Sequence, residues 1–554
     1  MVFDGTKVEV ASFDVYDTTL RDGTQQEGIN VSVADKLAIA ALLDELGVGF
    51  IEGGWPGAVP KDTEFFKRAV RELKLKNAVL AAFGSTRKAG ADVNTDAQVR
   101  ALLESEAPVI TLVAKSDSRH VAHALHTTNQ ENLAMITDTV ELLVNEGRRV
   151  ILDAEHFFDG YRYDPAYALE AIKAAFEAGA ETVCLCDTNG GMVPDLIADI
   201  FTEVRAALPN NARLGMHAHN DSGCAVANSL AAVAAGAVQV QGTVNGYGER
   251  TGNADLVTVI ANLKLKYGVD LLDVNLNQAT RIAHAIAEIT NMAPFSRQPY
   301  VGISAFAHKA GLHASAIKVH PDMYQHADPA VVGNGMRMLV SEMAGKASVE
   351  LKGRELGIDL TGQHDLLARV TKRVKDAEAS GYTYDAADAS FELLLREEQD
   401  GHRAQPFKVE SWRVFVESIP HHGDEEPVAE ATVKIKVGDQ RYVHTAEGNG
   451  PVNALDAALR QSLKADFPDI TNFELRDYKV RIMEADYGTD STTRVLITTS
   501  SPHRQWRTVG VGTNVIEASW EALIDAYTYG ILKHLTAAEP AETPETPETP
   551  NYHI

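Results

Sequence analysis

The chain has little cysteine and little positive charge. Its 554 residues include only three cysteines, Cys184, Cys186 and Cys224, which argues against a disulfide framework and indicates a reducing compartment, the cytoplasm. Lys plus Arg number 51 against 77 Asp plus Glu, a formal net charge of -26. Such a surface repels phosphate backbones, so we expect no nucleic-acid partner. A locally positive site for a small anion stays compatible with this charge.

Long apolar runs are also scarce. The first 14 residues lack the basic and then apolar pattern that is typical of a signal peptide. Residues 222–248 carry no charge, but they are rich in Ala and Gly and are interrupted by Asn228 and Gln239. A buried helix followed by a buried strand fits this stretch better than a bilayer span. We therefore expect no membrane partner.

Short β-rich segments alternate with helical patterns over the first half of the chain. Ser32 is predicted to cap the first helix and Gly47 to end it. Strands that alternate with helices imply a parallel sheet, and eight nearly continuous apolar strands are typical of a (β/α)8 TIM barrel. An open doubly wound sheet is the alternative, although no glycine-rich fingerprint opens the first helix. The eight segments are 10–17, 48–54, 77–84, 108–115, 149–156, 181–187, 212–219 and 237–244.

The pattern changes twice beyond Lys266. It is helical to about residue 397, and from Trp412 strands followed by a helix occur twice, which is typical of an α+β domain. The tail repeats Glu-Thr-Pro three times and is expected to be disordered. The predicted α/β fold thus has four parts, which are a catalytic TIM barrel (1–268), helical linker subdomains (269–405), an α+β regulatory domain (406–536) and a disordered tail (537–554).

Polar side chains follow the predicted strands at the end where a TIM barrel reacts. His217 and His219 lie two residues apart on a strand, so they share a face and can both ligate one divalent metal when neutral. Asp22, after the first strand, would add an oxygen donor, and such a set suits Mg, Mn or Zn. The alternative is a pair of core histidines bonded to backbone carbonyls. Arg21 either forms a surface ion pair or binds a carboxylate or carbonyl.

Four motifs, in this order, resemble those of the metal-dependent Claisen-condensing barrel enzymes, the family of 2-isopropylmalate, homocitrate and citramalate synthases. They are DTTLRDGTQ, HAHND, GERTGNADL and AFAHKAGLHASA. Three further segments, EGGWPGAVPKD, LDAEHFFDGY and KSDSRHVAHALHTTNQENL, are most similar to the citramalate synthase branch. The resemblance covers about residues 8–535 and implies a homodimer whose C-terminal domain binds a branched-chain amino acid effector.

The resemblance also implies which residues hold the divalent metal. Asp22, His217 and His219 are in the positions of the family's metal ligands. Asn253 is in the position of an asparagine at or near the metal.

The same resemblance implies which residues bind and convert the substrates. Arg21 would polarise the keto acid as a catalytic residue, and Thr188 would bind its carboxylate. Glu155 and His313 match the catalytic glutamate and histidine, and Tyr324 matches a tyrosine that follows that histidine.

The implied reaction condenses acetyl-CoA with pyruvate, a small 2-keto acid, to give citramalate and CoA in isoleucine biosynthesis, under feedback control. Two alternatives are a 2-isopropylmalate synthase, which takes 2-oxoisovalerate, and a metal-dependent acyl-CoA lyase or aldolase. A third is a non-catalytic amino acid sensor built on a decayed barrel. The long C-terminal region favours a regulated synthase over a lyase, and the intact Arg21, Asp22 and His217 argue against a sensor.

Overall fold

The computed structural model of the chain describes residues 13–271, 273–417, 428–483 and 490–537. The chain divides into two compact units, Met1–Phe306 with Ala327–Gly335, and Ala307–His326 with Met336–Ile554. Apart from residue 537, the tail that was predicted to be disordered lies outside the described residues. Within the described ranges, no helix combines the length and the apolar character needed to cross a membrane.

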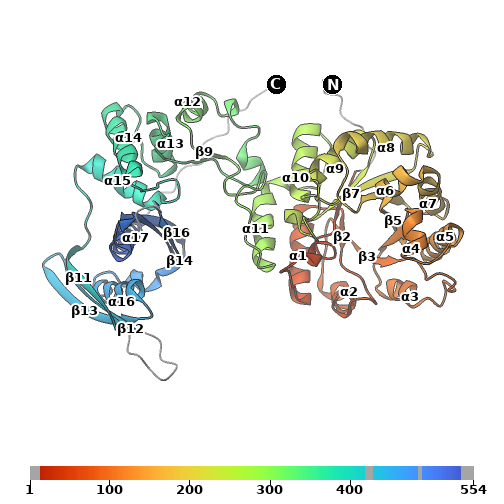
Figure 1. Cartoon of the computed structure of the whole chain (residues 1–554), viewed down its shortest axis with the longest axis horizontal. Coiled ribbons are helices and arrows are strands. Elements are labelled where there is room, and N and C mark those ends of the chain that lie inside the picture. Colours follow the sequence, from red (N-terminus) through yellow and green to blue (C-terminus); the bar gives the residue numbers. More distant parts are fainter. Residues whose placement is uncertain (1–12, 272, 418–427, 484–489, 538–554) are drawn as a thin grey trace. The chain divides into compact units, whose positions relative to one another are not determined.

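Eight parallel strands of the first unit close into a barrel, in which each strand pairs with the next and β1 pairs with β8. Figure 1 shows these strands inside a ring of helices. The closed order confirms the predicted TIM barrel and excludes an open doubly wound sheet. The strands are β1 (Asp14–Asp17), β2 (Phe50–Glu52), β3 (Val79–Ser85), β4 (Val109–Lys115), β5 (Arg149–Glu155), β6 (Thr182–Asp187), β7 (Arg213–Ala218) and β8 (Gln239–Gly242).

Helices connect the barrel strands. The first of them begins at a capping box, in which Ser32 accepts from the Asp35 backbone, and ends at Gly47 with φ 88°. Both predicted boundaries are confirmed. The helices of this unit are α1 (Val33–Leu46), α2 (Pro60–Glu72), α3 (Ala97–Glu104), α4 (Ser118–His123), α5 (Asn129–Asn145), α6 (Phe157–Tyr163), α7 (Pro165–Glu177), α8 (Pro194–Ala206), α9 (Ala225–Ala234), α10 (Leu256–Asn262) and α11 (Ala279–Ile289).

Alternating side chains of each strand face the helices and the barrel interior. On β5, Leu152 belongs to the large core shared with the helices, whereas Ile151 packs inside the barrel with Tyr16 and Phe50. The next interior positions of β5 are polar, Asp153 and Glu155. The interior of the barrel is therefore filled by apolar side chains toward the amino ends of its strands and is lined by polar side chains toward their carboxyl ends.

The second unit combines helices with two antiparallel sheets. Each sheet has three strands in sequence order, with α16 against one and α17 against the other. This repeat confirms the predicted strands-then-helix pattern. The elements are β9 (Ala307–His308), α12 (Gly311–Val319), β10 (Arg337–Met338), α13 (Lys346–Glu355), α14 (His364–Ala379), α15 (Asp388–Asp400), β11 (Lys408–Glu417), β12 (Val428–Val437), β13 (Gln440–Gly448), α16 (Pro451–Leu463), β14 (Glu474–Ile482), β15 (Thr493–Ser501), β16 (Arg504–Gly512) and α17 (Val515–Ala537).

Three strands of this unit were not predicted. The two-residue strands β9 and β10 pair in parallel within the stretch that was expected to be helical, and the third strand is β16. It pairs with β15 along its whole length and packs against α17. Its sequence carries Gly510 and Gly512, which are depleted in strands and typical of turns, so the local pattern is weak. The pairing with β15 outweighs that local preference.

The close approach of the Gly47 backbone, at the end of α1, to the Asp273 backbone can be tested by substitution. A Cβ at this position would lie 1.8 Å from the carbonyl oxygen of Asp273. We expect Gly47→Ala to cost more than the about 1–2 kcal/mol of a left-handed L-residue, because the backbone must also move. The control is Gly147→Ala, since Gly147 has φ 77° but nothing within 4 Å of the added Cβ. Equal losses in thermal unfolding of the two variants would contradict this interpretation.

Candidate active site and metal centre

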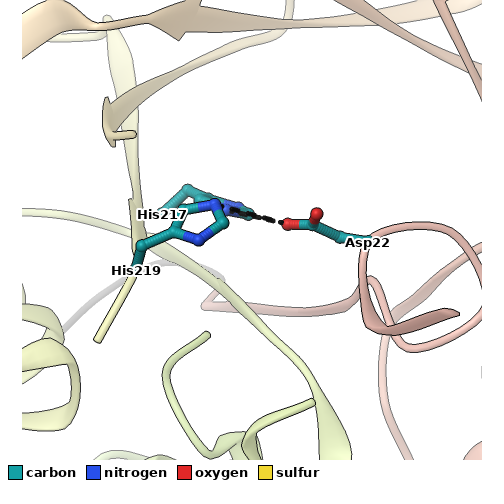
Figure 2. A group of neighbouring side chains, drawn as sticks. All are labelled: Asp22, His217 and His219. Carbon is teal, nitrogen blue, oxygen red and sulfur yellow. Dashed lines mark ion pairs between the residues drawn. The ribbon is translucent and has the colours of Figure 1, made fainter. Parts of the chain in front are cut away.

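Three predicted metal ligands meet at the carboxyl end of the barrel. His217 lies on β7, His219 follows directly after it, and Asp22 lies in the loop after β1. The Nε2 atoms of His217 and His219 are 3.3 Å and 3.7 Å from Oδ2 of Asp22. Figure 2 shows the Asp22 carboxylate directed toward both imidazole rings. All three side chains are buried, and their ligand atoms form a group that could hold a metal ion.

The fourth predicted ligand, Asn253, lies next to His219 through an isolated antiparallel bridge. Its Nδ2 donates to the Tyr247 carbonyl at 2.9 Å, whereas its buried Oδ1 has no hydrogen-bond partner among the described residues. Gly248 permits this approach, because a Cβ there would lie 2.3 Å from Asn253 Nδ2. A buried amide oxygen without a donor costs about 1–3 kcal/mol. A cation that binds this oxygen would remove that cost.

Charges around the cluster set its protonation. Although burial favours the neutral form, Arg21 and His217 hold the pKa of Asp22 well below its usual range. Burial and the neighbouring His217 lower the pKa of His219 to about 4, so this ring is neutral at pH 7. Burial opposes a charge on His217, but the hydrogen bond to Asp22 raises its pKa. A divalent cation would compete with that proton for Nε2.

The donor set fits a divalent metal. The carboxylate of Asp22 and the imidazoles of His217 and His219 are donors that suit Mg, Mn or Zn, and the amide oxygen of Asn253 stays a predicted fourth donor. A second group, formed by Asp153, Cys184 and Cys186, also has donor atoms within 4.8 Å of one another. Burial raises the pKa of Cys184 well above its usual range, and burial raises that of Cys186 to about 11 against the opposing effect of its contact with Cys184. We therefore assign the metal to the histidine cluster and interpret the two cysteines as buried strand thiols.

Arg21 lies beside the cluster. Its Nε donates to Oε2 of Glu52 at 2.6 Å, its Nη1 is 3.4 Å from Oδ1 of Asp22, and its guanidinium lies 3.9 Å from the centre of the Phe83 ring. The side chain is 11% exposed, which excludes a simple surface ion pair. Because Glu52 holds one edge of the guanidinium, the remaining N–H groups keep a fixed orientation.

Glu155 and Thr188 lie at the ends of the next strands. Glu155 ends β5 and forms an ion pair with Lys115, its register partner at the end of β4. Thr188 follows β6, and its hydroxyl oxygen accepts a hydrogen bond from the backbone N–H of His156 at 2.8 Å. Since that oxygen already accepts, its own O–H is available to donate to a substrate oxygen.

These side chains border one cavity of about 590 Å³. This volume is within the range of sites for small molecules and cofactors. Its wall contains the four carboxylates of Asp22, Asp153, Glu155 and Glu249, and also four cationic side chains besides Arg21 that can attract an anion. These cationic side chains are Arg87, Lys88, Lys115 and Arg250.

His313 and Tyr324 belong to the second unit. His313 lies on α12, and its ring stacks on that of Tyr324 with a centroid distance of 4.0 Å. The two residues predicted to be catalytic in this segment therefore touch each other. Their catalytic roles stay predictions.

Several side chains of the site had no predicted role. The sequence analysis assigned no role to Glu52, Lys115, Asp153 or Gln241. Lys115 ends β4, so the rule that reactive residues follow barrel strands was sufficient to find it. Asp153 lies two residues before Glu155 and Gln241 lies two after Gln239, so period-two counting places them in the barrel interior.

Sequence profiles of known families match three consecutive regions of the chain. The HMGL-like family matches residues 12–286, which contain the barrel and the metal cluster. The homocitrate synthase post-HMGL domain-like family matches 300–381, and the LeuA allosteric (dimerisation) domain matches 385–531. The fold and the site thus define a condensing enzyme with an HMGL-like barrel and a LeuA-type domain.

Relatives of known activity match nearly the full chain. An (R)-citramalate synthase of Streptomyces coelicolor is 62% identical over 523 residues, which are 94% of this chain and 97% of that enzyme. An (R)-citramalate synthase of Synechocystis is 48% identical over 93% of this chain and 96% of that enzyme. A 2-isopropylmalate synthase of Methanocaldococcus jannaschii is 30% identical, over 95% of each. The chain belongs to the (R)-citramalate synthase family, which confirms the resemblance seen in its motifs.

Asp22 can be tested as a metal ligand by titrating the metal-free chain with Mn²⁺ under electron paramagnetic resonance. We expect one strong site, and we expect Asp22→Asn to weaken it by more than the about 10–100-fold that is typical of residues behind a ligand. The control is Asp14→Asn, which removes the same charge at the other end of β1, where Asp14 pairs with Arg213. Equal affinity in Asp22→Asn and the unchanged chain would contradict the assignment.

Proposed function

We propose that the chain joins the methyl carbon of acetyl-CoA to the keto carbon of pyruvate and that water then hydrolyses the thioester, so that acetyl-CoA, pyruvate and water give citramalate and CoA. The observation that carries this proposal is the buried cluster of Asp22, His217 and His219 beside Arg21, in a chain that is 62% identical to an (R)-citramalate synthase over nearly its whole length. A condensation of this type needs an electrophilic ketone and a deprotonated thioester methyl group in one water-poor cavity.

The cluster and Arg21 have different roles in making the ketone electrophilic. A bound divalent cation supplies a Lewis acid, and Asp22, His217, His219 and Asn253 would hold it. Arg21, oriented by Glu52, donates to the keto oxygen and stabilises the negative charge that develops there.

The remaining predicted residues act on the carboxylate and on the thioester. Thr188 donates its hydroxyl hydrogen to the carboxylate of the 2-keto acid. Glu155 supplies an acid–base group for proton transfer at the acetyl group, and His313 and Tyr324 stay predicted catalytic residues. The Glu155–Lys115 ion pair keeps this carboxylate at the cavity wall.

A 2-isopropylmalate synthase is the second candidate, because such an enzyme matches 95% of this chain at lower identity. The two candidates differ in the substituent of the acceptor, a methyl group in pyruvate and an isopropyl group in 2-oxoisovalerate. A lyase or a non-catalytic sensor has less support, since the relatives that match the full chain are synthases.

The choice between acceptors can be tested by measuring CoA release from acetyl-CoA with pyruvate, 2-oxobutyrate, 2-oxoisovalerate and 2-oxoglutarate. We expect kcat/KM for pyruvate to exceed that for 2-oxoisovalerate by at least about 10-fold, the scale on which a pocket discriminates one methylene group. Arg21→Lys should lower turnover with every acceptor, because lysine lacks the planar fork. A larger kcat/KM for 2-oxoisovalerate would replace the proposal by the second candidate.

We also propose that residues 406–536 form a regulatory domain of a homodimer, that residues 1–268 and 269–405 are the catalytic barrel and the helical linker, and that the product enters isoleucine synthesis. The match of residues 385–531 to the LeuA allosteric (dimerisation) domain supports the first part. The described cysteines are free, which is compatible with the predicted cytoplasmic location.

The effector can be tested by calorimetry on the full-length chain. We expect L-isoleucine to bind and to inhibit CoA release, because the end product of a pathway is the usual signal for its first enzyme. D-isoleucine is the matched control, since it has the same composition and the opposite configuration. If isoleucine, leucine and valine neither release heat nor inhibit, the regulatory proposal is wrong.

A further inference from the structure

A chain of hydrogen bonds lies behind the metal cluster. Nδ1 of His217 is 3.0 Å from Oε1 of Gln241, and Nε2 of Gln241 donates to Oδ1 of Asp153 at 2.9 Å. The three side chains come from β7, β8 and β5, and each is at most 5% exposed. His217 and Gln241 are register partners on adjacent strands, so their side chains lie side by side on the interior face.

The hydrogen bonds that link His217, Gln241 and Asp153 have only one consistent assignment of donors and acceptors. The Gln241 amide presents its nitrogen to Oδ1 of Asp153, and a carboxyl oxygen that carries no hydrogen can only accept this bond. The Oε1 of Gln239, 3.4 Å from the same nitrogen, favours the same orientation. The amide oxygen of Gln241 is then directed at His217, whose Nδ1 must carry the hydrogen.

This direction determines which nitrogen of His217 can bind a cation. A neutral imidazole with hydrogen on Nδ1 has its lone pair on Nε2, the atom 3.3 Å from Oδ2 of Asp22. The second histidine is held differently, because Nδ1 of His219 is buried with no hydrogen-bond partner in the described part of the chain. Of the two imidazole ligands, His217 is therefore the one whose tautomer and orientation are imposed by the barrel.

We propose that Gln241 and Asp153 are positioning residues that hold His217 with Nε2 directed at the metal. Gln241 acts on the ring directly, and Asp153 acts by fixing the amide of Gln241. Residues behind a metal ligand commonly tune affinity in this way. The inference depends on the metal centre of the proposed function and not on which 2-keto acid is the acceptor.

Mn²⁺ affinity of the metal-free, full-length chain is the primary measurement. We expect Gln241→Leu, which keeps the volume and removes both hydrogen bonds, to weaken Mn²⁺ binding about 10–100-fold. The matched control is Gln239→Leu, on the same strand and face, which removes only the 3.4 Å contact with the Gln241 amide and leaves the bonds from Gln241 to His217 and Asp153, so affinity should fall much less than in Gln241→Leu. Asp153→Ala is a second variant that removes the hydrogen bond between Asp153 and Gln241. We expect it to destabilise the fold less than Gln241→Leu, since Asp153 lines the cavity and water can fill the space.

A double change tests the hydrogen bonds rather than the packing. Asp153→Asn combined with Gln241→Glu keeps the net charge and re-forms both bonds, because the new carboxylate accepts from His217 and from the new amide. We expect its Mn²⁺ affinity to return close to that of the unchanged chain, and its kcat at saturating metal to exceed that of Asp153→Ala. Thermal unfolding of each variant shows whether a loss reflects folding alone.

The outcomes separate the inference from the proposed function. If the unchanged chain binds no Mn²⁺, the metal centre itself is wrong. If the unchanged chain binds Mn²⁺ and Asp153→Ala binds it equally well, the positioning role is wrong. The role is also wrong if the double change binds Mn²⁺ as weakly as Asp153→Ala, or if Gln239→Leu and Gln241→Leu lose affinity alike.

Discussion

Closure of the barrel by the pairing of β1 with β8 is the constraint on which the site depends. Four consecutive register pairs, from Asp14 with Gln239 to Asp17 with Gly242, join the two ends of the barrel sequence. Two further bonds continue the contact above the strands, from Thr18 N to the Gly242 carbonyl and from Val244 N to the Thr19 hydroxyl, each 2.9 Å long. They hold the loop that carries Arg21 and Asp22 against the end of the sheet where β7 presents its histidines. An open sheet with the same strands would leave the carboxylate and the imidazoles apart.

Within that closed space, the environment rather than the residue type sets the state of each carboxylate. Arg21 and His217 outweigh burial at Asp22, so its pKa is lowered. At Asp17 burial dominates, and at Asp153 burial and the charge of Glu52 act together, so both pKa values are raised to about 7. Buried charges of this kind add little net stability, because their desolvation offsets their attraction. These buried carboxylates instead affect the positions of neighbouring side chains and the affinity for ligands. The proposed site, which would bind a cation and an anionic keto acid together, depends on both.

The candidate site residues are distributed over both compact units. The barrel unit contains the candidate metal ligands Asp22, His217 and His219, together with Arg21, Glu155 and Thr188, around one cavity. His313 and Tyr324 belong to the other unit, which also contains the LeuA-type domain. The first set is positioned by strands of one closed sheet, and such sites are precise because each strand end is fixed by its neighbours. The second set lies on and after the short helix α12. The candidate metal site and the predicted catalytic residues His313 and Tyr324 thus belong to different compact units, of which the second also contains the segment that matches the LeuA domain.

The sequence by itself determined the barrel, the repeated strands-then-helix domain and the grouping of Asp22 with His217 and His219. These features follow from local rules, since side chains alternate along a strand and parallel strands end on the same side of a sheet. Tertiary structure alone decided that Glu52 orients Arg21, that Lys115 pairs with Glu155, and that Asp153 and Gln241 lie behind His217. It also decided that the glycine-containing segment of β16 is a strand. Each of these depends on a partner on another strand, and the register that makes two residues neighbours is set by closure of the sheet, which no local pattern records.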